Sequence, residues 1–231
     1  MKMHAQPQRG GFTLVELLVV IVIIVTLAGL ATPQLIKMIK KGDQMTAINN
    51  GKQMMASMIE FNNEYGSFPD KETAKAVTER TGSTLSLTGD TANDYFRQLI
   101  AAKVIKSEDP FFAKTSISRT KPDNKYTGTE ALKAGEVGFG YIMNGMVALG
   151  NDDPNRIIAV APLLNNSAKG DFDTDPMDKA VMVYLDASVK LLDIREDKKI
   201  SMGKGKTLLD YGEGTVWGED IKPVIKVPKK K

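Results

Sequence analysis

Residues 9–33 read RGGFTLVELLVVIVIIVTLAGLATP, and this stretch decides the architecture of the chain. Between Thr13 and Ala31, Glu16 is the only ionisable residue. A transmembrane helix needs about 20 apolar residues to cross a hydrocarbon core of roughly 30 Å, and residues 12–31 supply that length. The stretch therefore predicts a single membrane-spanning helix.

The residues on either side of this run set its orientation. Lys2 and Arg9 precede it without an acidic residue, which by the positive-inside tendency keeps the N-terminus in the cytoplasm. Everything after Pro33 is then expected across the membrane. A secretory signal peptide is the alternative, but it fits less well, because the apolar region of a signal peptide is shorter, at about 7–15 residues.

Glu16 is the anomaly of the segment. A carboxylate inside a bilayer is costly and persists mainly where a partner neutralises it, and no basic residue of the segment can do so. If the chain were cut between Gly11 and Phe12, the new α-amino group of Phe12 would supply a positive charge at the same depth. The amine of a neighbouring copy is an equally good partner, because such a pair is strong in a low dielectric. Glu16 is therefore predicted to set the register between subunits.

These residues resemble the N-terminus of type IV pilin-like proteins, a family that includes pilins and the pseudopilins of type II secretion. The resemblance implies that a prepilin peptidase cleaves after Gly11 and methylates Phe12. Glu16 then matches the glutamate at the fifth mature position, and Pro33 matches the proline at the twenty-second. A shorter likeness, in FNNEYGSFPD at residues 61–70, is to the segment after the long helix in the major pseudopilin of type II secretion.

The resemblance also implies a function. Mature subunits of this family wait in the inner membrane, and an assembly ATPase and a polytopic platform protein move them into a helical filament. The chain is interpreted as a structural subunit of such a filament, a pseudopilin of a type II secretion system. Its expected partners are membrane lipid, the prepilin peptidase, the inner-membrane platform and other subunits. The alternative is a monomeric binding protein held outside the cytoplasm by a single-pass anchor.

The predicted fold is α+β, with a long N-terminal helix packed on an antiparallel β-sheet head. Apolar residues recur at three-to-four spacing after Pro33, which extends the helix to about Tyr65. The expected parts are a leader at 1–11, a transmembrane and filament-core helix at 12–33, an amphipathic continuation at 34–65, and a head at 66–231 with a Gly- and Lys-rich C-terminal tail.

Pro33 is expected to disturb this helix. Proline lacks an N–H, and its ring crowds the carbonyl four residues earlier, here that of Gly29. A kink or local melting is therefore predicted between Gly29 and Pro33. It is either a bend where the helix leaves the membrane or, as the resemblance implies, a segment that stretches on filament packing.

The head sequence indicates a second helix followed by strands. The helix is capped at Thr91 or Asn93, and four β-type runs come after it: GFGYIM, RIIAVAP, AVMVYLD and SVKLLDI. The last two runs are separated by a tight turn near Asp186 and Ala187, which predicts an antiparallel hairpin. The tail beyond these runs has few periodic apolar residues.

Composition excludes several kinds of site. The chain has no cysteine, and its one histidine, His4, lies in the expected leader. A mature protein without either residue has no Ser-His-Asp triad and no thiolate or histidine metal site, so no enzymatic activity is expected. The formal charge of +3 is spread among intermixed acidic and basic residues, which gives little support for a nucleic-acid partner.

An acidic run is the candidate for a bound ion. GDFDTDPMD places Asp171, Asp173 and Asp175 at alternate positions, and oxygen ligands so spaced can hold Ca²⁺. The pattern departs from an EF-hand loop, because Pro176 stands at the required glycine and Met182 at the bidentate glutamate. A solvated acidic loop is the alternative, and no cofactor is otherwise expected.

Overall fold

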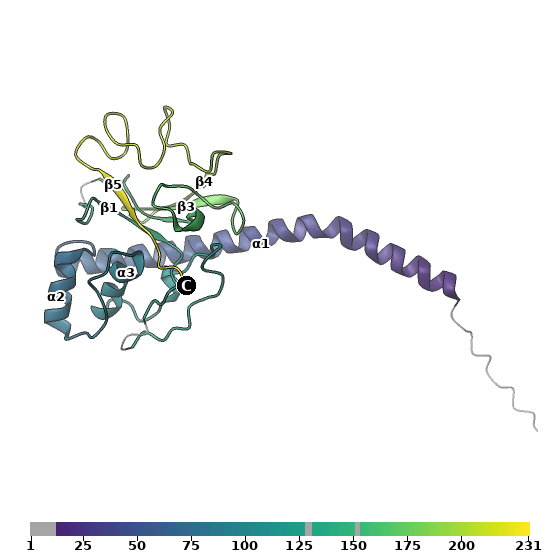
Figure 1. The fold of residues 1–231 in the computed structure, drawn as a ribbon, viewed down its shortest axis with the longest axis horizontal. Coiled ribbons are helices and arrows are strands. Elements are labelled where there is room, and N and C mark those ends of the chain that lie inside the picture. Colours follow the sequence, from purple (N-terminus) through teal and green to yellow (C-terminus); the bar gives the residue numbers. More distant parts are fainter. Residues whose placement is uncertain (1–12, 128–130, 151–152) are drawn as a thin grey trace, which may run out of the picture. The chain divides into compact units, whose positions relative to one another are not determined.

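The computed structural model describes residues 13–127, 131–150 and 153–231, and its longest element is helix α1, Leu14–Tyr65. Contacts within the chain group into two units, residues up to 39 and residues 40–231. The second unit, here called the head, packs the later part of α1 on a five-stranded antiparallel sheet (Figure 1). The predicted α+β fold is therefore confirmed.

The head contains two further helices, two short 3₁₀ turns and the sheet. The helices are α2 (Lys71–Thr81) and α3 (Ala92–Ala101), and the 3₁₀ turns are Asp109–Phe111 and Leu164–Asn166. The strands are β1 (Gly140–Asn144), β2 (Ile157–Ala161), β3 (Lys179–Tyr184), β4 (Val189–Asp193) and β5 (Pro223–Lys226). They lie in the order β4-β3-β2-β1-β5, and each neighbouring pair is antiparallel.

Several elements begin and end where the sequence places them. Gly66, with φ +79°, follows the last residue of α1, and a left-handed glycine is a common helix terminator. α3 starts after Thr91, whose backbone N–H and hydroxyl both donate to the carboxylate of Asp94. β3 and β4 form the predicted hairpin, and Ala187 in its turn has φ +64°. Local sequence signals at these positions therefore predict the element boundaries correctly.

Two elements were missing from the sequence interpretation. α2 begins at an N-cap, Asp70, whose carboxylate accepts the backbone N–H groups of Glu72 and Thr73 at 2.9 Å. β5 comes from the tail, where no strand was expected, and it pairs with β1 at the edge of the sheet. The tail therefore completes the sheet.

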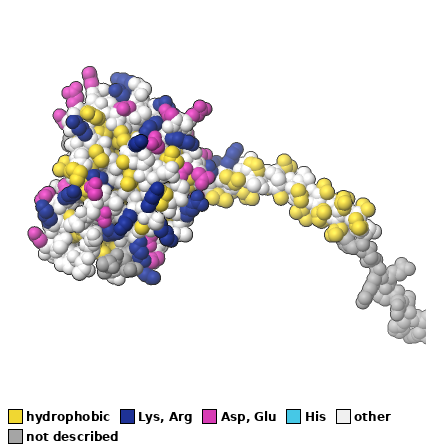
Figure 2. All heavy atoms as spheres, in the orientation of Figure 1, with side chains coloured by type: hydrophobic (Ala, Val, Ile, Leu, Met, Phe, Trp, Pro, Cys, Tyr) yellow, Lys and Arg dark blue, Asp and Glu magenta, His cyan; other side chains and the backbone are white. Residues whose placement is uncertain are grey.

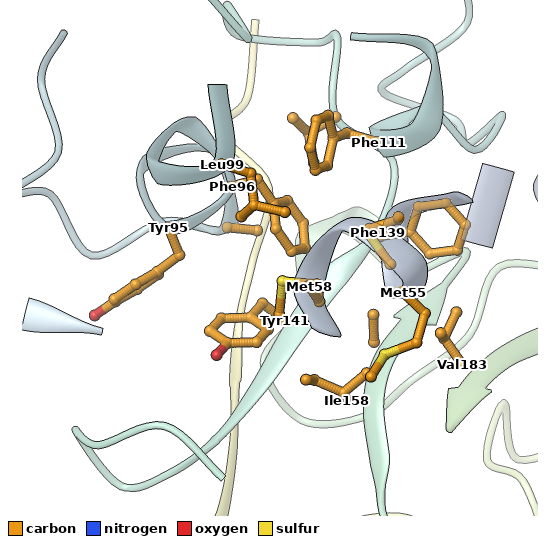
Figure 3. Packing of buried hydrophobic residues seen from close by; sticks show 14 of the residues in the cluster. Met55, Met58, Tyr95, Phe96, Leu99, Phe111, Phe139, Tyr141, Ile158 and Val183 are labelled. Atoms are coloured by element: carbon orange, nitrogen blue, oxygen red, sulfur yellow. The ribbon is translucent and has the colours of Figure 1, made fainter. Parts of the chain in front are cut away.

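The later part of α1 buries its apolar face against one side of the sheet. Met55 and Met58 of α1 lie among Phe96 of α3, Tyr141 of β1 and Phe139, which directly precedes β1 (Figure 3). The rings of Phe96 and Tyr141 are 5.6 Å apart and tilted, the arrangement that aromatic pairs prefer. This cluster is the larger of the two hydrophobic cores of the head.

The opposite side of the sheet is also covered, by the chain between β4 and β5. Trp217 is buried there, and its indole N–H donates to the carbonyl of Leu208 at 2.6 Å. In β3, Val181 and Val183 belong to the core on the α1 side, whereas Met182 belongs to the core around Trp217. A strand buried on both faces needs apolar residues at every position, which explains the unbroken run in β3.

The closest approach of α1 to the sheet occurs at Gly51. A Cβ at this position would lie 2.9 Å from a methyl group of Val183, whereas a Cβ at Gly42 would have no neighbour within 4 Å. Both glycines are inside α1, so alanine improves helix propensity equally at both, by about 1 kcal/mol. Only the Gly51 substitution overpacks a core, which costs about 1–3 kcal/mol.

We expect Gly42→Ala to raise the free energy of unfolding of the head by about 0.5–1 kcal/mol and Gly51→Ala to lower it by about 1 kcal/mol. The measurement is denaturant unfolding of the full-length protein in detergent, followed by the fluorescence of Trp217, the single tryptophan of the chain. Equal stabilisation by both substitutions would contradict the close contact between α1 and β3.

An ion pair fastens β5 to the start of α3. Lys226, whose side chain is 6% exposed, donates to the two carboxylate oxygens of Asp90 at 2.8 and 3.1 Å, and the Tyr95 hydroxyl donates to the same carboxylate at 2.9 Å. Partial burial raises the pKa of Asp90, but the hydrogen bonds from Lys226 and Tyr95 outweigh it, so that the net pKa is lowered. A lowered pKa means that the pair stabilises the head above the unfolded pKa of about 3.9.

We expect Asp90→Asn to destabilise the head at pH 7 by about 1 kcal/mol, less than for a fully buried pair because the Asp90 side chain is 57% exposed. The difference from the wild type should shrink as the pH falls below about 4, because Asp90 then takes up a proton in the unfolded chain before it does so in the folded head. Unfolding curves between pH 3 and pH 7 measure this difference. Asp197→Asn, at an exposed pair with Arg195, is the control and should have little effect.

Candidate membrane and assembly segment

The described part of the first unit is the beginning of α1, and its apolar side chains are all exposed. Every residue from 13 to 39 is exposed, and Figure 2 shows hydrophobic side chains along this part of α1, whereas charged side chains are scattered over the head. Among the described residues, α1 is the one helix long and apolar enough to cross a membrane. The large apolar residues exposed here are Leu14, Val15, Leu17, Leu18, Val19, Val20, Ile21, Val22, Ile23, Ile24, Val25, Leu27, Leu30, Leu35, Ile36, Met38 and Ile39.

The charged residues that bracket this surface are spaced to fit a bilayer. No Asp, Glu, Lys or Arg lies between Glu16 and Lys37. At 1.5 Å per residue, the 21 steps between them measure roughly 32 Å along the helix, close to the thickness of a hydrocarbon core. A spanning helix therefore places Glu16 near one edge of the apolar layer and Lys37 near the other.

The two threonines inside the apolar run bond to the helix backbone itself. The hydroxyl of Thr26 donates to the carbonyl of Val22, and that of Thr32 donates to the carbonyl of Ala28, both at 2.7 Å. A hydroxyl without a partner is costly in lipid, and a bond to the carbonyl four residues earlier removes that cost. Neither threonine opposes insertion.

Glu16 forms a capping box with Thr13 at the start of α1. Its Oε2 accepts the backbone N–H of Thr13 at 2.8 Å and the Thr13 hydroxyl at 2.7 Å, and the Glu16 N–H donates back to Thr13 Oγ1 at 3.2 Å. The sequence interpretation missed this role, although the pattern T-x-x-E was readable. Both donors on Thr13 are neutral, so the cap leaves the negative charge of Glu16 uncompensated.

The helix runs through the predicted weak point. Gly29 and Pro33 both lie inside α1, and residues between them are helical. Pro33 offers no N–H to the carbonyl of Gly29, so the helix lacks one hydrogen bond at this step. A Cβ at Gly29 would have no neighbour within 4 Å, so packing within the chain does not require glycine there. Melting of this step stays a prediction about the assembled state.

The predicted processing residues Gly11 and Phe12 lie outside the described residues. Thr13, the first described residue, is the N-cap of α1 in the capping box with Glu16. An α-amino group created at Phe12 would be one residue before this cap.

The three calcium candidates do not gather into one site. Asp171 pairs with Lys199 at 2.6 Å, and Asp173, which is buried, accepts the backbone N–H of Asp175 at 3.0 Å. Among the described residues, the acidic side chains close enough together to share an ion do not include any of these three. The alternate spacing of the aspartates shapes a loop and does not form a cage.

Comparison with known proteins identifies the N-terminal segment. Residues 7–32 match the family model described as the prokaryotic N-terminal methylation motif. The chain therefore carries a prepilin-type, type IV pilin-like segment, which implies processing by a prepilin peptidase and assembly with pilin-like subunits. No curated protein and no solved structure matches the chain. The motif includes Gly11, Phe12 and Glu16 and ends one residue before Pro33.

Proposed function

We propose that this protein is a structural, non-enzymatic subunit of a type IV pilus-like filament, and that the filament is the pseudopilus of a type II secretion system. The observation that carries the proposal is that the methylation motif lies on the part of α1, up to residue 39, whose apolar side chains are all exposed. Such a surface is unstable in water and requires either lipid or neighbouring helices. A subunit that moves from membrane to filament meets both requirements in turn.

The membrane stage follows from length and charge. We place residues 12–33 across the inner membrane, with the N-terminus in the cytoplasm and the head outside it. Lys37, Lys40 and Lys41 follow the span and outnumber Lys2 and Arg9 before it, which alone would favour the opposite orientation. The positive-inside tendency counts short loops, and a head of residues 40–231 is long enough to be translocated regardless of charge.

The filament stage depends on Glu16. Cleavage after Gly11 creates an α-amino group on Phe12, and a carboxylate and an amine at equal depth in an apolar layer attract one another strongly. The bond from Thr13 orients the carboxylate at the start of the helix but does not neutralise it. We therefore assign to Glu16 the pairing with the amine of an adjacent subunit, which fixes the axial offset between them.

The Gly29–Pro33 step has a role in the same proposal. A missing hydrogen bond between Pro33 and Gly29 makes this turn of α1 the easiest to open. Opening lengthens a helix at little cost because glycine accepts many backbone conformations. We propose that residues 29–33 extend when helices pack in the filament core.

The first prediction of this proposal concerns the mature N-terminus. The protein purified from cells that contain a prepilin peptidase should begin at an N-methylated Phe12, because the resemblance to type IV pilin-like proteins implies a cut after Gly11. Mass spectrometry of the intact protein and of its N-terminal peptide measures both changes. Cells without the peptidase provide the control, in which Met1 or Lys2 remains. An uncut chain in a functional filament would contradict the proposal.

The second prediction separates the pairing role of Glu16 from its capping role. Glu16→Ala should insert into the membrane normally but enter filaments at least tenfold less than the wild type when the two are co-expressed. Thr13→Ala is the matched variant, because it removes the two hydroxyl bonds of the capping box and keeps the carboxylate, and it should enter filaments nearly as well as the wild type. Quantitative mass spectrometry of sheared filaments measures the ratio.

Two outcomes would contradict the assignment of Glu16. Normal incorporation of Glu16→Ala would show that no pairing is needed. An equal loss for Thr13→Ala and Glu16→Ala would show that Glu16 acts by starting the helix. Membrane fractionation of both variants confirms that the comparison is made between inserted proteins.

A further inference from the structure

Three carboxylates converge in the head, and none of them belongs to the acidic run at residues 171–175. Glu108 precedes the 3₁₀ turn at Asp109–Phe111, Asp123 lies in the loop that follows, and Glu136 lies in the turn before β1. One carboxylate oxygen from each lies within 4.8 Å of the others. Three like charges so close together repel one another unless a cation or a proton lies among them.

Glu108 gives this cluster the character of a built site. Its side chain is fully buried, and its Oε1 accepts the backbone N–H of Leu132 at 2.6 Å. Its Oε2 is also buried and has no hydrogen-bond partner. A buried carboxylate oxygen without a partner is unusual and costly, and an ion at the cluster would satisfy it.

The electrostatic surroundings of Glu108 agree with this geometry. Burial raises the pKa of its carboxyl, the bond from Leu132 opposes the rise, and the negative charges of Glu136 and Asp123 add to it. These are the conditions under which a carboxylate gains most from a cation. The negative charges lie close together because the fold brings acidic side chains from three separate segments to one place.

Backbone and side-chain contacts hold the three segments in position. Asn124 accepts the backbone N–H of Glu108 at 2.8 Å, and Glu136 accepts the backbone N–H of Lys133 at 2.5 Å. The ammonium of Lys133 lies 2.9 Å from Oδ2 of Asp123, and its side chain is 37% exposed. Lys133 thus supports Asp123 from the solvent side, while Glu108 Oε2 stays unpaired on the buried side.

We propose that Glu108, Asp123 and Glu136 form a binding site for one hard divalent cation, with Ca²⁺ the expected ion. Oxygens bound to one Ca²⁺ at 2.3–2.6 Å lie up to about 5 Å apart, so a single ion can contact all three carboxylates. All three ligands are oxygen donors, and the Asp123 side chain is 38% exposed, which leaves room for the waters that complete six to eight ligands. Mg²⁺ needs shorter, octahedral contacts and is expected to bind more weakly.

The ion would act as a clasp in the head. It would join the loop after α3 to the turn that leads into β1, and β1 lies at the centre of the contacts between α1, α3 and β5. Binding to the folded head alone stabilises it by mass action. This inference is independent of cleavage and filament assembly, because it concerns the folding of a single chain.

The test uses the full-length protein in detergent, freed of metal by chelation. Thermal unfolding is followed by Trp217 fluorescence with and without Ca²⁺ or Mg²⁺, and calorimetric titration gives the stoichiometry. We expect one Ca²⁺ per chain and a rise of about 5–10 °C in the unfolding temperature at a Ca²⁺ concentration 100 times the dissociation constant.

Variants locate the ion. Glu108→Gln keeps the acceptor for Leu132 but removes the charge, and should weaken Ca²⁺ binding at least tenfold while leaving the metal-free protein as stable as the wild type or more so. Asp123→Asn, at an exposed position that tolerates substitution, should also weaken binding. Asp171→Asn, in the separate acidic run, is the matched control and should respond to Ca²⁺ as the wild type does.

Three results would overturn the inference. The first is an unfolding temperature of the wild type that 10 mM Ca²⁺ does not change. The second is a Ca²⁺ response of both Glu108→Gln and Asp123→Asn that equals that of the wild type. The third is loss of the Ca²⁺ response in Asp171→Asn. The last result would place the ion at residues 171–175 instead.

Discussion

The exposed apolar surface of α1 between residues 13 and 39 is the constraint on which the rest depends. A helix that is apolar all round is stable only when lipid or protein surrounds it, because removing such a surface from water lowers the free energy considerably. The head cannot supply this cover, since α1 already gives the sheet the face formed by its later residues, including Met55 and Met58. The apolar first half of α1 therefore needs lipid or another protein molecule to cover it.

The head must in turn be stable whether its helix is in lipid or among other helices. It achieves this with two cores, one on each side of a single sheet. The chain between β4 and β5 covers the side opposite α1, and β5 then returns to pair with β1. This closes the fold through contacts within residues 40–231. Stability of the head is thus independent of what surrounds the first half of α1.

The sequence predicted those parts of the fold and the site that depend on local chemistry. The length of α1, its end at Gly66, the cap of α3 at Thr91 and the β3–β4 hairpin all rest on neighbouring residues, and all are present. β5 has only four residues, and its partner β1 lies about 80 positions earlier, so no local pattern identifies it.

Local sequence patterns also failed to identify which acidic side chains lie together in the fold. Asp171, Asp173 and Asp175 looked like ligands because they are close in sequence, but the fold directs them to different partners. Glu108 and Glu136 are 28 positions apart, and only the folded chain brings them together with Asp123. Spacing predicts a metal site where one loop holds all the ligands, and it cannot do so where the ligands come from three segments.

Glu16 has a local role as part of the helix cap, and the proposed filament gives the same side chain a second, intermolecular role. The capping box satisfies hydrogen bonds, and an isolated helix gains from it in any solvent. A glutamine at N3 could serve the same cap without a charge, so capping alone does not explain why the residue is acidic. The charge is stabilising only when a cation lies near the start of the helix, and residues 13–36 contain no basic side chain that could be this cation. In the proposed filament, Thr13 orients a carboxylate whose counter-charge is the α-amino group of an adjoining chain, and that pairing would convert the orientation into register.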